Sequence, residues 1–101
     1  TTASIEGRPV QEYLGVINAQ SIIGANMFKD IFAGLRDLIG GRSKTYERVI
    51  EEAKEDAMRE LTQKAQSVGA NAVVGIDLDF ETVGASGSML MVIATGTAVR
   101  I

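Results

Sequence analysis

The chain has 101 residues, a formal net charge of −3, and neither cysteine nor histidine. Compact domains usually hold about 100–150 residues, so we expect a single domain over residues 1–101. Hydrophobic residues make up 46% and charged residues 23% of the chain, which is typical of a globular protein. The missing cysteine and histidine exclude disulfides, thiolate or imidazole metal sites, and nucleophile pairs that need a histidine. The ten basic residues are scattered, so we expect no nucleic-acid partner.

The start of the chain, Thr1 to Ser4, has neither the basic nor the apolar region of a signal peptide. The uncharged stretch from Tyr13 to Phe28 is interrupted by polar residues and is shorter than the roughly 20 apolar residues that span a bilayer. We therefore expect no membrane partner and a cytoplasmic location.

The first third of the chain predicts strands. Residues 10–23 are rich in β-branched side chains and lack a helical stripe, so they predict one or two strands, interrupted near Gly15 or Asn18. A short strand over residues 1–5 is expected before them, with a turn over residues 6–9.

The next two segments have the period of amphipathic helices. The first has Asn26 as a plausible N-cap and ends at the glycine pair 40–41. The second has Ser43 or Thr45 as its N-cap and ends at Gly69. Its apolar stripe comprises Tyr46, Val49, Ile50, Ala53, Ala57, Leu61, Ala65 and Val68. Its outer face predicts ion pairs four residues apart at Arg48/Glu52, Glu55/Arg59 and Glu60/Lys64.

The last third predicts a hairpin. Residues 71–83 alternate, with one face made of Ala72, Val74, Ile76, Leu78 and Phe80 and the other carrying Asp77, Asp79 and Glu81. Residues 84–87 form the turn, and residues 88–101 form the partner strand. The tripeptide Gly-Ala-Asn occurs at 24–26 and again at 69–71, in opposite contexts that favour coincidence over an internal repeat.

The final strand does not alternate, because Arg100 is its only charged residue and both faces are apolar or small. Two helices can cover one face of a small sheet, so we expect another subunit to cover the second face. The predicted interface residues are Met89, Met91, Ile93, Gly96 and Ala98. The alternative is a central strand whose far face is merely apolar and small.

Three segments of the chain resemble the YbjQ family. They are residues 24–43 (GANMFKDIFAGLRDLIGGRS) with Tyr46-Glu47, residues 69–77 (GANAVVGID), and residues 88–99, which contain SMLMV and GTAV. The resemblance implies a small two-layer α+β subunit of the dodecin type, with a mainly antiparallel sheet packed by a long helix and a shorter helix. It also implies assembly into a five-fold ring in which extra short strands join neighbours. The family's function is not established, and its label "putative heavy-metal-binding" fits poorly with a chain that lacks cysteine and histidine.

Two candidate metal sites remain. Asp77, Asp79 and Glu81 line one strand face, at a spacing that suits a hard divalent cation only if another segment adds oxygen ligands. The alternative is a solvated face whose acids discourage edge pairing. Met89 and Met91 are the only closely spaced soft ligands, although methionine in an apolar strand more often fills a core or an interface.

The corner between the two helices contains Gly40, Gly41, Arg42 and Ser43. A glycine pair, an arginine and a helix N-terminus can together hold an anion, although the spacing is not that of a phosphate-binding loop. The alternative is a tight corner in which Arg42 pairs with Asp37 of the same or a neighbouring subunit.

No acid–base pair is placed by the sequence in an apolar pocket, so we expect no enzyme. The preferred prediction is a non-catalytic homo-oligomer, of five subunits or a multiple of five as the resemblance implies, that works as a binding or scaffold module. The alternative is a protein that binds a divalent metal ion or a small anion. We expect no resident cofactor.

Overall fold

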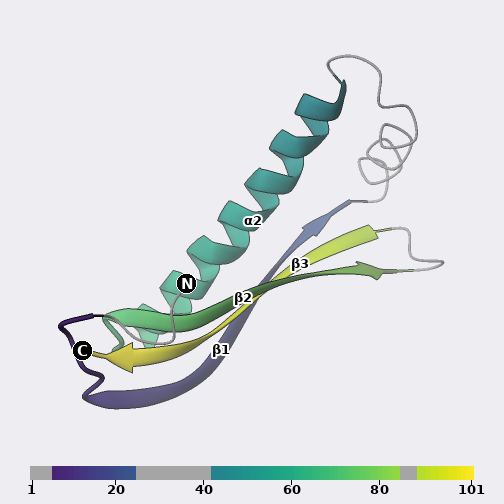
Figure 1. The fold of residues 1–101 in the computed structure, drawn as a ribbon. Helices are drawn as coiled ribbons and strands as arrows, with labels where there is room; N and C mark the ends of the chain where they lie inside the picture. Colours follow the sequence, from purple (N-terminus) through teal and green to yellow (C-terminus); the bar gives the residue numbers. More distant parts are fainter. Residues whose placement is uncertain (1–5, 25–41, 85–88) are drawn as a thin grey trace.

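A computed structural model describes residues 6–24, 42–84 and 89–101. Its elements are β1 (Glu12–Ile23), α2 (Arg42–Ser67), β2 (Ala72–Val83) and β3 (Met89–Arg100). The strands form an antiparallel sheet in the order β1-β3-β2, and α2 lies across one face of it (Figure 1). This confirms the predicted small α+β fold with an antiparallel sheet under a long helix. The shorter helix predicted from Asn26 and the strand predicted at residues 1–5 lie outside the described residues.

β1 is one continuous strand with a bulge. Its register with β3 shifts between Tyr13 and Gly15, and Gly15 has a φ of 115°. Residues that carry a Cβ rarely adopt a positive φ, so a glycine at this position supplies the backbone freedom that the bulge needs. The interruption predicted near Gly15 is therefore confirmed as a bulge, and β1 continues without a break through Asn18.

The predicted C-terminal end of α2 is close to the observed one, whereas its predicted N-terminal end is not. The helix begins at Arg42, so Ser43 and Thr45 lie inside its first turn and the predicted N-caps are wrong. The C-terminal end is close to the predicted one, because Gly69 adopts a φ of 85° and ends the helix. The N–H of Ala70 then donates to the carbonyl of Ala65 at 3.0 Å, which satisfies one of the free carbonyls of the last turn.

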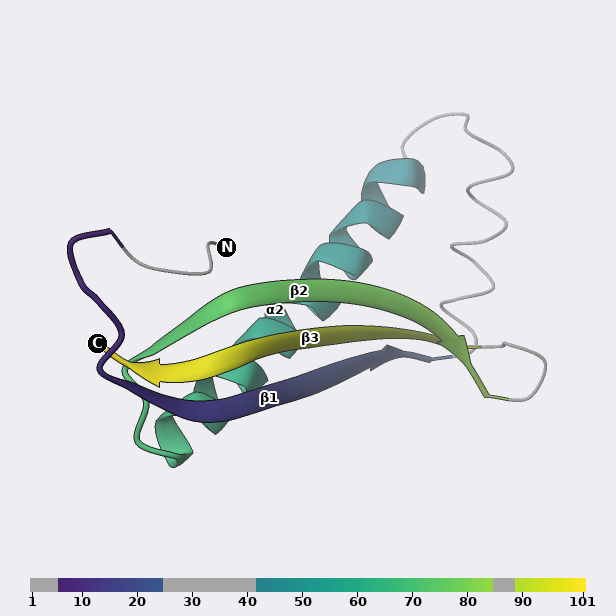
Figure 2. The ribbon, with the colours of Figure 1, turned by 60° about the horizontal axis from the view of Figure 1, so that its bottom comes forward.

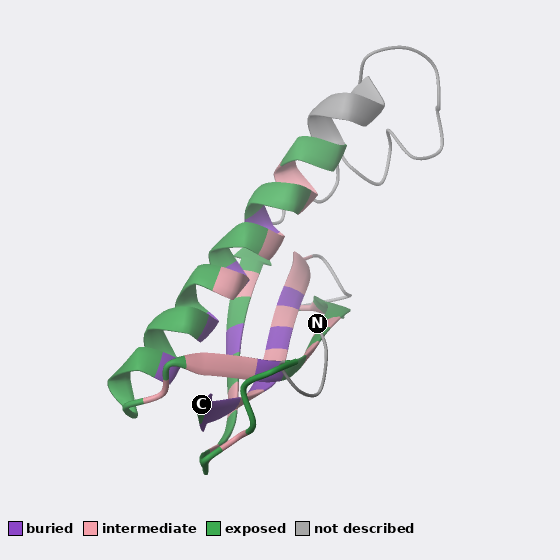
Figure 3. Ribbon diagram, turned by 60° about the vertical axis from the view of Figure 1, so that its left-hand side comes forward, coloured by how far each residue is buried: buried purple, intermediate pink, exposed green. Residues whose placement is uncertain are grey.

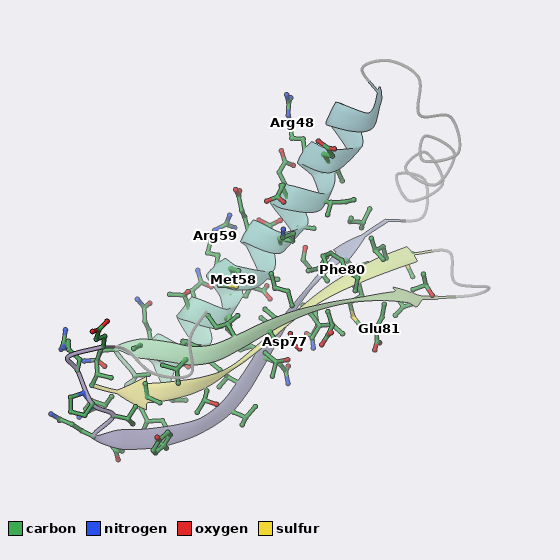
Figure 4. All side chains as sticks on the ribbon, in the orientation of Figure 1. Arg48, Met58, Arg59, Asp77, Phe80 and Glu81 are labelled. Carbon is green, nitrogen blue, oxygen red and sulfur yellow. The ribbon has the colours of Figure 1, made fainter. Side chains whose placement is uncertain are left out.

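The outer face of α2 carries ion pairs three residues apart. Lys54 lies 2.9 Å from Glu51, and Arg59 lies 3.0 Å from Asp56. None of the three predicted pairs at a spacing of four forms among the described residues. Figure 4 shows Arg48 and Arg59 pointing away from the sheet. The outer face of α2 is charged and solvent-exposed, as predicted. The predicted ion pairs were wrong, because the ion pairs that form join other residues.

The core lies between α2 and the sheet, as the colouring in Figure 3 shows. Four helix residues spaced by four are buried against it: Ala53, Ala57, Leu61 and Ala65. Three of them are alanines, and two of these, Ala53 and Ala57, belong to the same cluster as Ala19 of β1 and Ala94 of β3. Small side chains on both layers let the helix approach the strands closely, and Leu61 fills the remaining space. Val68, the last residue of the predicted stripe, is instead 45% exposed.

β2 also contains a bulge, and this bulge corrects the predicted faces. Val74 pairs with Thr97 and Asp77 with Thr95, so three steps along β2 match two steps along β3. Gly75 has a φ of 62° at this point. Val74 and Ala72 therefore share the face of the three acids, whereas we had predicted them on the face of Leu78. An inserted residue inverts the alternation, which a strict period of two cannot reveal.

β3 is the central strand, which explains why its sequence does not alternate. Its side facing α2 is buried at Val92, Ala94, Gly96 and Ala98. Its other side is half-buried at Met89, Met91 and Ile93, and no described element crosses that face of the sheet (Figure 2).

No helix within the described ranges is long and apolar enough to cross a membrane.

Candidate functional site

The face of the sheet opposite α2, which we call the open face, carries an apolar patch. The register places Val16 beside Thr97 and Ile22 beside Met91 on this face. Val16 is 73% exposed, Ile22 is 56% exposed, and Tyr13 is 71% exposed at the same edge. Asn18 and Gln20 stand between Val16 and Ile22 on this face, so the exposed apolar side chains gather at its two ends, and Ile22 adjoins Met91 of β3. Contiguous exposed apolar surface of this kind is typical of an interaction surface.

Three carboxylates lie beside this patch on β2. Asp77, Asp79 and Glu81 stand in a row on the open face, opposite Thr95, Ile93 and Met91 of β3. The Asp77 carboxylate raises the pKa of Asp79 above its ordinary value, with smaller contributions from desolvation, a hydrogen bond to Asp77 and the charge of Glu81. The raised pKa indicates that the negative charges of the neighbouring carboxylates repel the ionised form of Asp79.

The row of acids has an incomplete ligand set for a metal ion. Hard cations such as Ca²⁺ take six or more oxygen ligands, and carboxylates along one strand diverge from a common centre. Within residues 6–24, 42–84 and 89–101, no three acidic side chains form a group that could hold a metal ion. Metal binding at Asp77, Asp79 and Glu81 therefore stays a prediction that needs ligands from elsewhere.

The predicted interface residues divide between the two faces of β3. Met89, Met91 and Ile93 lie on the open face, half-buried and available to a partner. Gly96 and Ala98 lie on the side of α2 and are buried within the chain itself. A Cβ at Gly96 would stand 2.6 Å from a methyl group of Val73. The close approach that we had predicted between subunits at Gly96 is thus made inside the subunit.

The predicted anion corner falls at the edge of what the structure describes. Asp37, Gly40 and Gly41 lie outside the described residues. Arg42 and Ser43 form the start of α2. The choice between an anion site and a structural Arg42–Asp37 pair stays open.

A polar clamp that we did not predict joins the end of α2 to the end of β3. The side-chain amide of Asn71 accepts a hydrogen bond from the N–H of Ile101 at 2.8 Å and donates to its carbonyl at 3.1 Å. Arg100 donates to the carbonyl of Gly69 at 3.0 Å. The Gly-Ala-Asn tripeptide at 69–71 was the available signal: its glycine ends the helix and its asparagine holds the C-terminal strand.

A second unpredicted contact ties α2 to β1. Lys64 donates from Nζ to the backbone carbonyl of Asn18 at 2.6 Å. Lysine at a sheet edge discourages pairing with another strand, because the partner would have to bury or displace its charge. The free edge of β1 is therefore guarded near its middle.

Comparison with known proteins places this chain among proteins of unknown function. Residues 1–101 match the YbjQ family, which is described as "putative heavy-metal-binding". Two proteins from Caulobacter vibrioides strains, both named UPF0145 protein, are 60% identical to it over 99 residues, covering 98% of this chain and 94% of theirs.

Among solved structures, a protein of unknown function of the DUF74 family from Pediococcus pentosaceus has a similar fold. The TM-score is 0.61 at 17% identity, over 89% of this chain and 84% of that one. An identity this low supports the fold alone. The family match over residues 1–101 and the 60% identity to the Caulobacter vibrioides proteins confirm the resemblance found from the sequence: the chain belongs to the YbjQ family.

Proposed function

We propose that this protein is a non-catalytic subunit of a homo-oligomeric ring that works as a binding or scaffold module. The observation that carries the proposal is the apolar patch of the open face, where Tyr13, Val16 and Ile22 are more than half exposed beside a row of half-buried apolar residues on β3. A second copy that covers this patch would remove the apolar surface from water, which is the main driving force for association. The number five rests on the family resemblance.

The chemistry of the described residues favours a non-catalytic role. General acid–base catalysis needs a titratable group held in a protected site with a pKa tuned to its task. The pKa of Asp79 is raised, mainly by Asp77, but Asp79 stands on an exposed strand face and not in a protected site. No polar or charged side chain among the described residues is buried.

Native mass spectrometry and light scattering at micromolar concentration test the assembly. We expect several subunits, five or a multiple of five, and we expect Val16→Glu and Met91→Glu to dissociate them, because each places a charge in the patch. Gln63→Glu adds the same charge on the exposed outer face of α2 and should leave the assembly intact. Circular dichroism checks that the variants fold. A wild type that stays monomeric would contradict the proposal.

A second candidate function is binding of a divalent cation by the row of acids. It is favoured by the repulsion that raises the pKa of Asp79, because a bound cation would relieve it. Calorimetric titration with Zn²⁺, Ca²⁺ and Cu(I) tests it. With no thiol or imidazole available, we expect Zn²⁺ to bind no tighter than exposed carboxylates allow and chelators to leave stability unchanged. Submicromolar Zn²⁺ affinity that is lost in Asp77→Asn with Asp79→Asn would establish the metal function instead.

A further inference from the structure

β2 is an edge strand whose side facing α2 is only partly covered. α2 packs mainly on β1 and β3, so it leaves much of β2 free (Figure 1). The register places Leu78 and Phe80 on the side of α2, and Phe80 is nevertheless 47% exposed. Figure 4 shows Phe80 on the helix side of the strand and Asp77 and Glu81 on the other. The strand therefore has an apolar side and an acidic side, and no described element fully covers either of them.

A groove continues the apolar side toward the start of β2. It has a volume of about 520 Å³ and lies between the C-terminal half of α2 and the beginning of β2. Its lining consists mostly of small and apolar side chains: Thr62, Ala65, Gln66, Ala70, Asn71, Ala72, Val73 and Ile76. Together with Leu78 and Phe80, the groove gives β2 an unfilled apolar strip beside its outer edge.

The outer edge of β2 has no partner strand among residues 6–24, 42–84 and 89–101. In the part of the chain that the structure describes, β2 pairs with β3 alone, and no other hydrogen bond of that part reaches its outer edge. β1, the other edge strand, differs because Lys64 occupies the carbonyl of Asn18. Unpaired backbone groups beside an apolar strip are the features that an added strand uses, since main-chain hydrogen bonds give affinity and side-chain contacts give specificity.

The acidic side determines which strand can add. Pairing of β2 with β2 of a second copy would bring two rows of carboxylates face to face, and like charges directly opposite each other are destabilising. A strand with lysine or arginine on that side would instead meet Asp77, Asp79 and Glu81 as opposite charges. We propose that β2 binds an extended segment of another protein in which apolar and basic residues alternate, adding it as a fourth strand. The apolar residues contact Leu78 and Phe80, and the basic residues contact the row of acids.

The bulge of β2 limits the length of this site. Regular pairing runs from Asp77 to Val83, because the register shifts between Val74 and Asp77. A strand that pairs with this stretch needs about seven residues, of which alternate ones share a face. The acidic side of this site adjoins the apolar patch proposed for ring formation, because Asp79 and Glu81 lie opposite Ile93 and Met91 on the open face; the edge and the apolar side of β2 lie outside that patch.

Fluorescence anisotropy of a labelled peptide against the full chain tests the proposal. The probe is a capped seven-residue peptide in which lysine and valine alternate. Its controls are a glutamate–valine version and a peptide of the same composition with the lysines and valines in separate blocks. A fourth peptide carries N-methyl groups on alternate residues, which remove the hydrogen bonds of one edge. We expect saturable binding of the alternating lysine peptide that is roughly tenfold tighter than that of each control, since three opposite-charge pairs each contribute modestly.

Variants of the protein locate the peptide on β2. Asp77→Asn with Asp79→Asn, and separately Phe80→Ser, should each weaken binding several-fold, whereas Glu55→Gln with Glu60→Gln removes two carboxylates from the exposed face of α2 and should not. The N-methylated peptide needs no variant, so the test holds even if Phe80→Ser fails to fold. Equal binding of the alternating and block peptides would show charge attraction alone and overturn the proposal. Displacement of a second copy by the peptide, seen as a fall in oligomer mass, would assign the edge to self-association and also overturn it.

Discussion

Replacing Gly96 with alanine tests whether the tight packing at this position belongs to the subunit itself. The added Cβ would stand 2.6 Å from Cγ1 of Val73 and 3.2 Å from Cγ1 of Ile76. Removing a glycine from a strand gains roughly 0.5–1 kcal/mol of stability, whereas overpacking of a core costs about 1–3 kcal/mol. We expect a net loss of about 1 kcal/mol in the free energy of unfolding, which lowers Tm by about 4–8 °C in a domain of this size.

Thermal melts followed by circular dichroism, at one fixed subunit concentration, measure this loss. Gly24→Ala is the matched control, because Gly24 is exposed and a Cβ there meets no atom within 4 Å. Adding Val73→Ala to Gly96→Ala removes the closest contact, so the double variant should lose less stability than the sum of the two single variants. The reasoning is refuted if Gly96→Ala melts like Gly24→Ala. It is equally refuted if the variant dissociates the oligomer and Val73→Ala restores nothing, because the contact would then lie between subunits.

Three further predictions concern polar groups. Asp79→Asn should raise Tm at neutral pH. The pKa of Asp79 is raised in the folded protein, mainly by Asp77, so ionised Asp79 destabilises the folded protein at any pH above this raised pKa. Below the ordinary aspartate pKa of about 3.9, Asp79 is protonated in the folded and unfolded protein and the destabilisation disappears. Melts across pH 3 to 7 should show the advantage of the variant disappearing in acid. Lys64→Met should cost about 1 kcal/mol and increase aggregation, since it frees the carbonyl of Asn18 at the edge of β1; denaturant unfolding and light scattering measure both. Asn71→Ala should cost about 1–2 kcal/mol and speed hydrogen exchange at the last amide of the chain, because two hydrogen bonds are lost.

Each of these variants has a control and a contrary outcome. Glu60→Gln removes a carboxylate from α2, so an equal gain in that variant would show that net charge, and not the row of acids, sets the stability. Lys54→Met breaks only a surface ion pair. If it aggregates as much as Lys64→Met, the aggregation does not arise from the edge of β1 and the prediction is wrong. Gln20→Ala removes an exposed amide from β1, and the prediction for Asn71 is wrong if both variants exchange the last amide at the same rate.

Local patterns in the sequence were enough to predict the elements themselves. The recurrence of apolar residues every three or four positions from Tyr46 to Ala65 predicted α2, and glycine predicted its end, because both depend on short-range geometry. Alternation and the glycine-containing turn likewise predicted the hairpin of β2 and β3. The absence of cysteine and histidine fixed the classes of chemistry available, since no fold can supply a missing side chain. The lack of alternation in the final strand indicated a strand with two apolar faces.

Tertiary structure decided how these elements share their surfaces. The bulge at Gly75 moved Val74 to the face of the acids, because one extra residue in the strand moves every preceding side chain to the opposite face of the sheet. The alternation of apolar and polar residues in the sequence does not reveal such an insertion. The order β1-β3-β2 buried Gly96 under Val73, so a residue that had suggested contact with another subunit serves the subunit's own packing. The contacts of Lys64 with Asn18 and of Asn71 with Ile101 join residues at least 30 positions apart. Such contacts depend on how the chain folds back on itself, and this long-range geometry is what no local pattern of residues can specify.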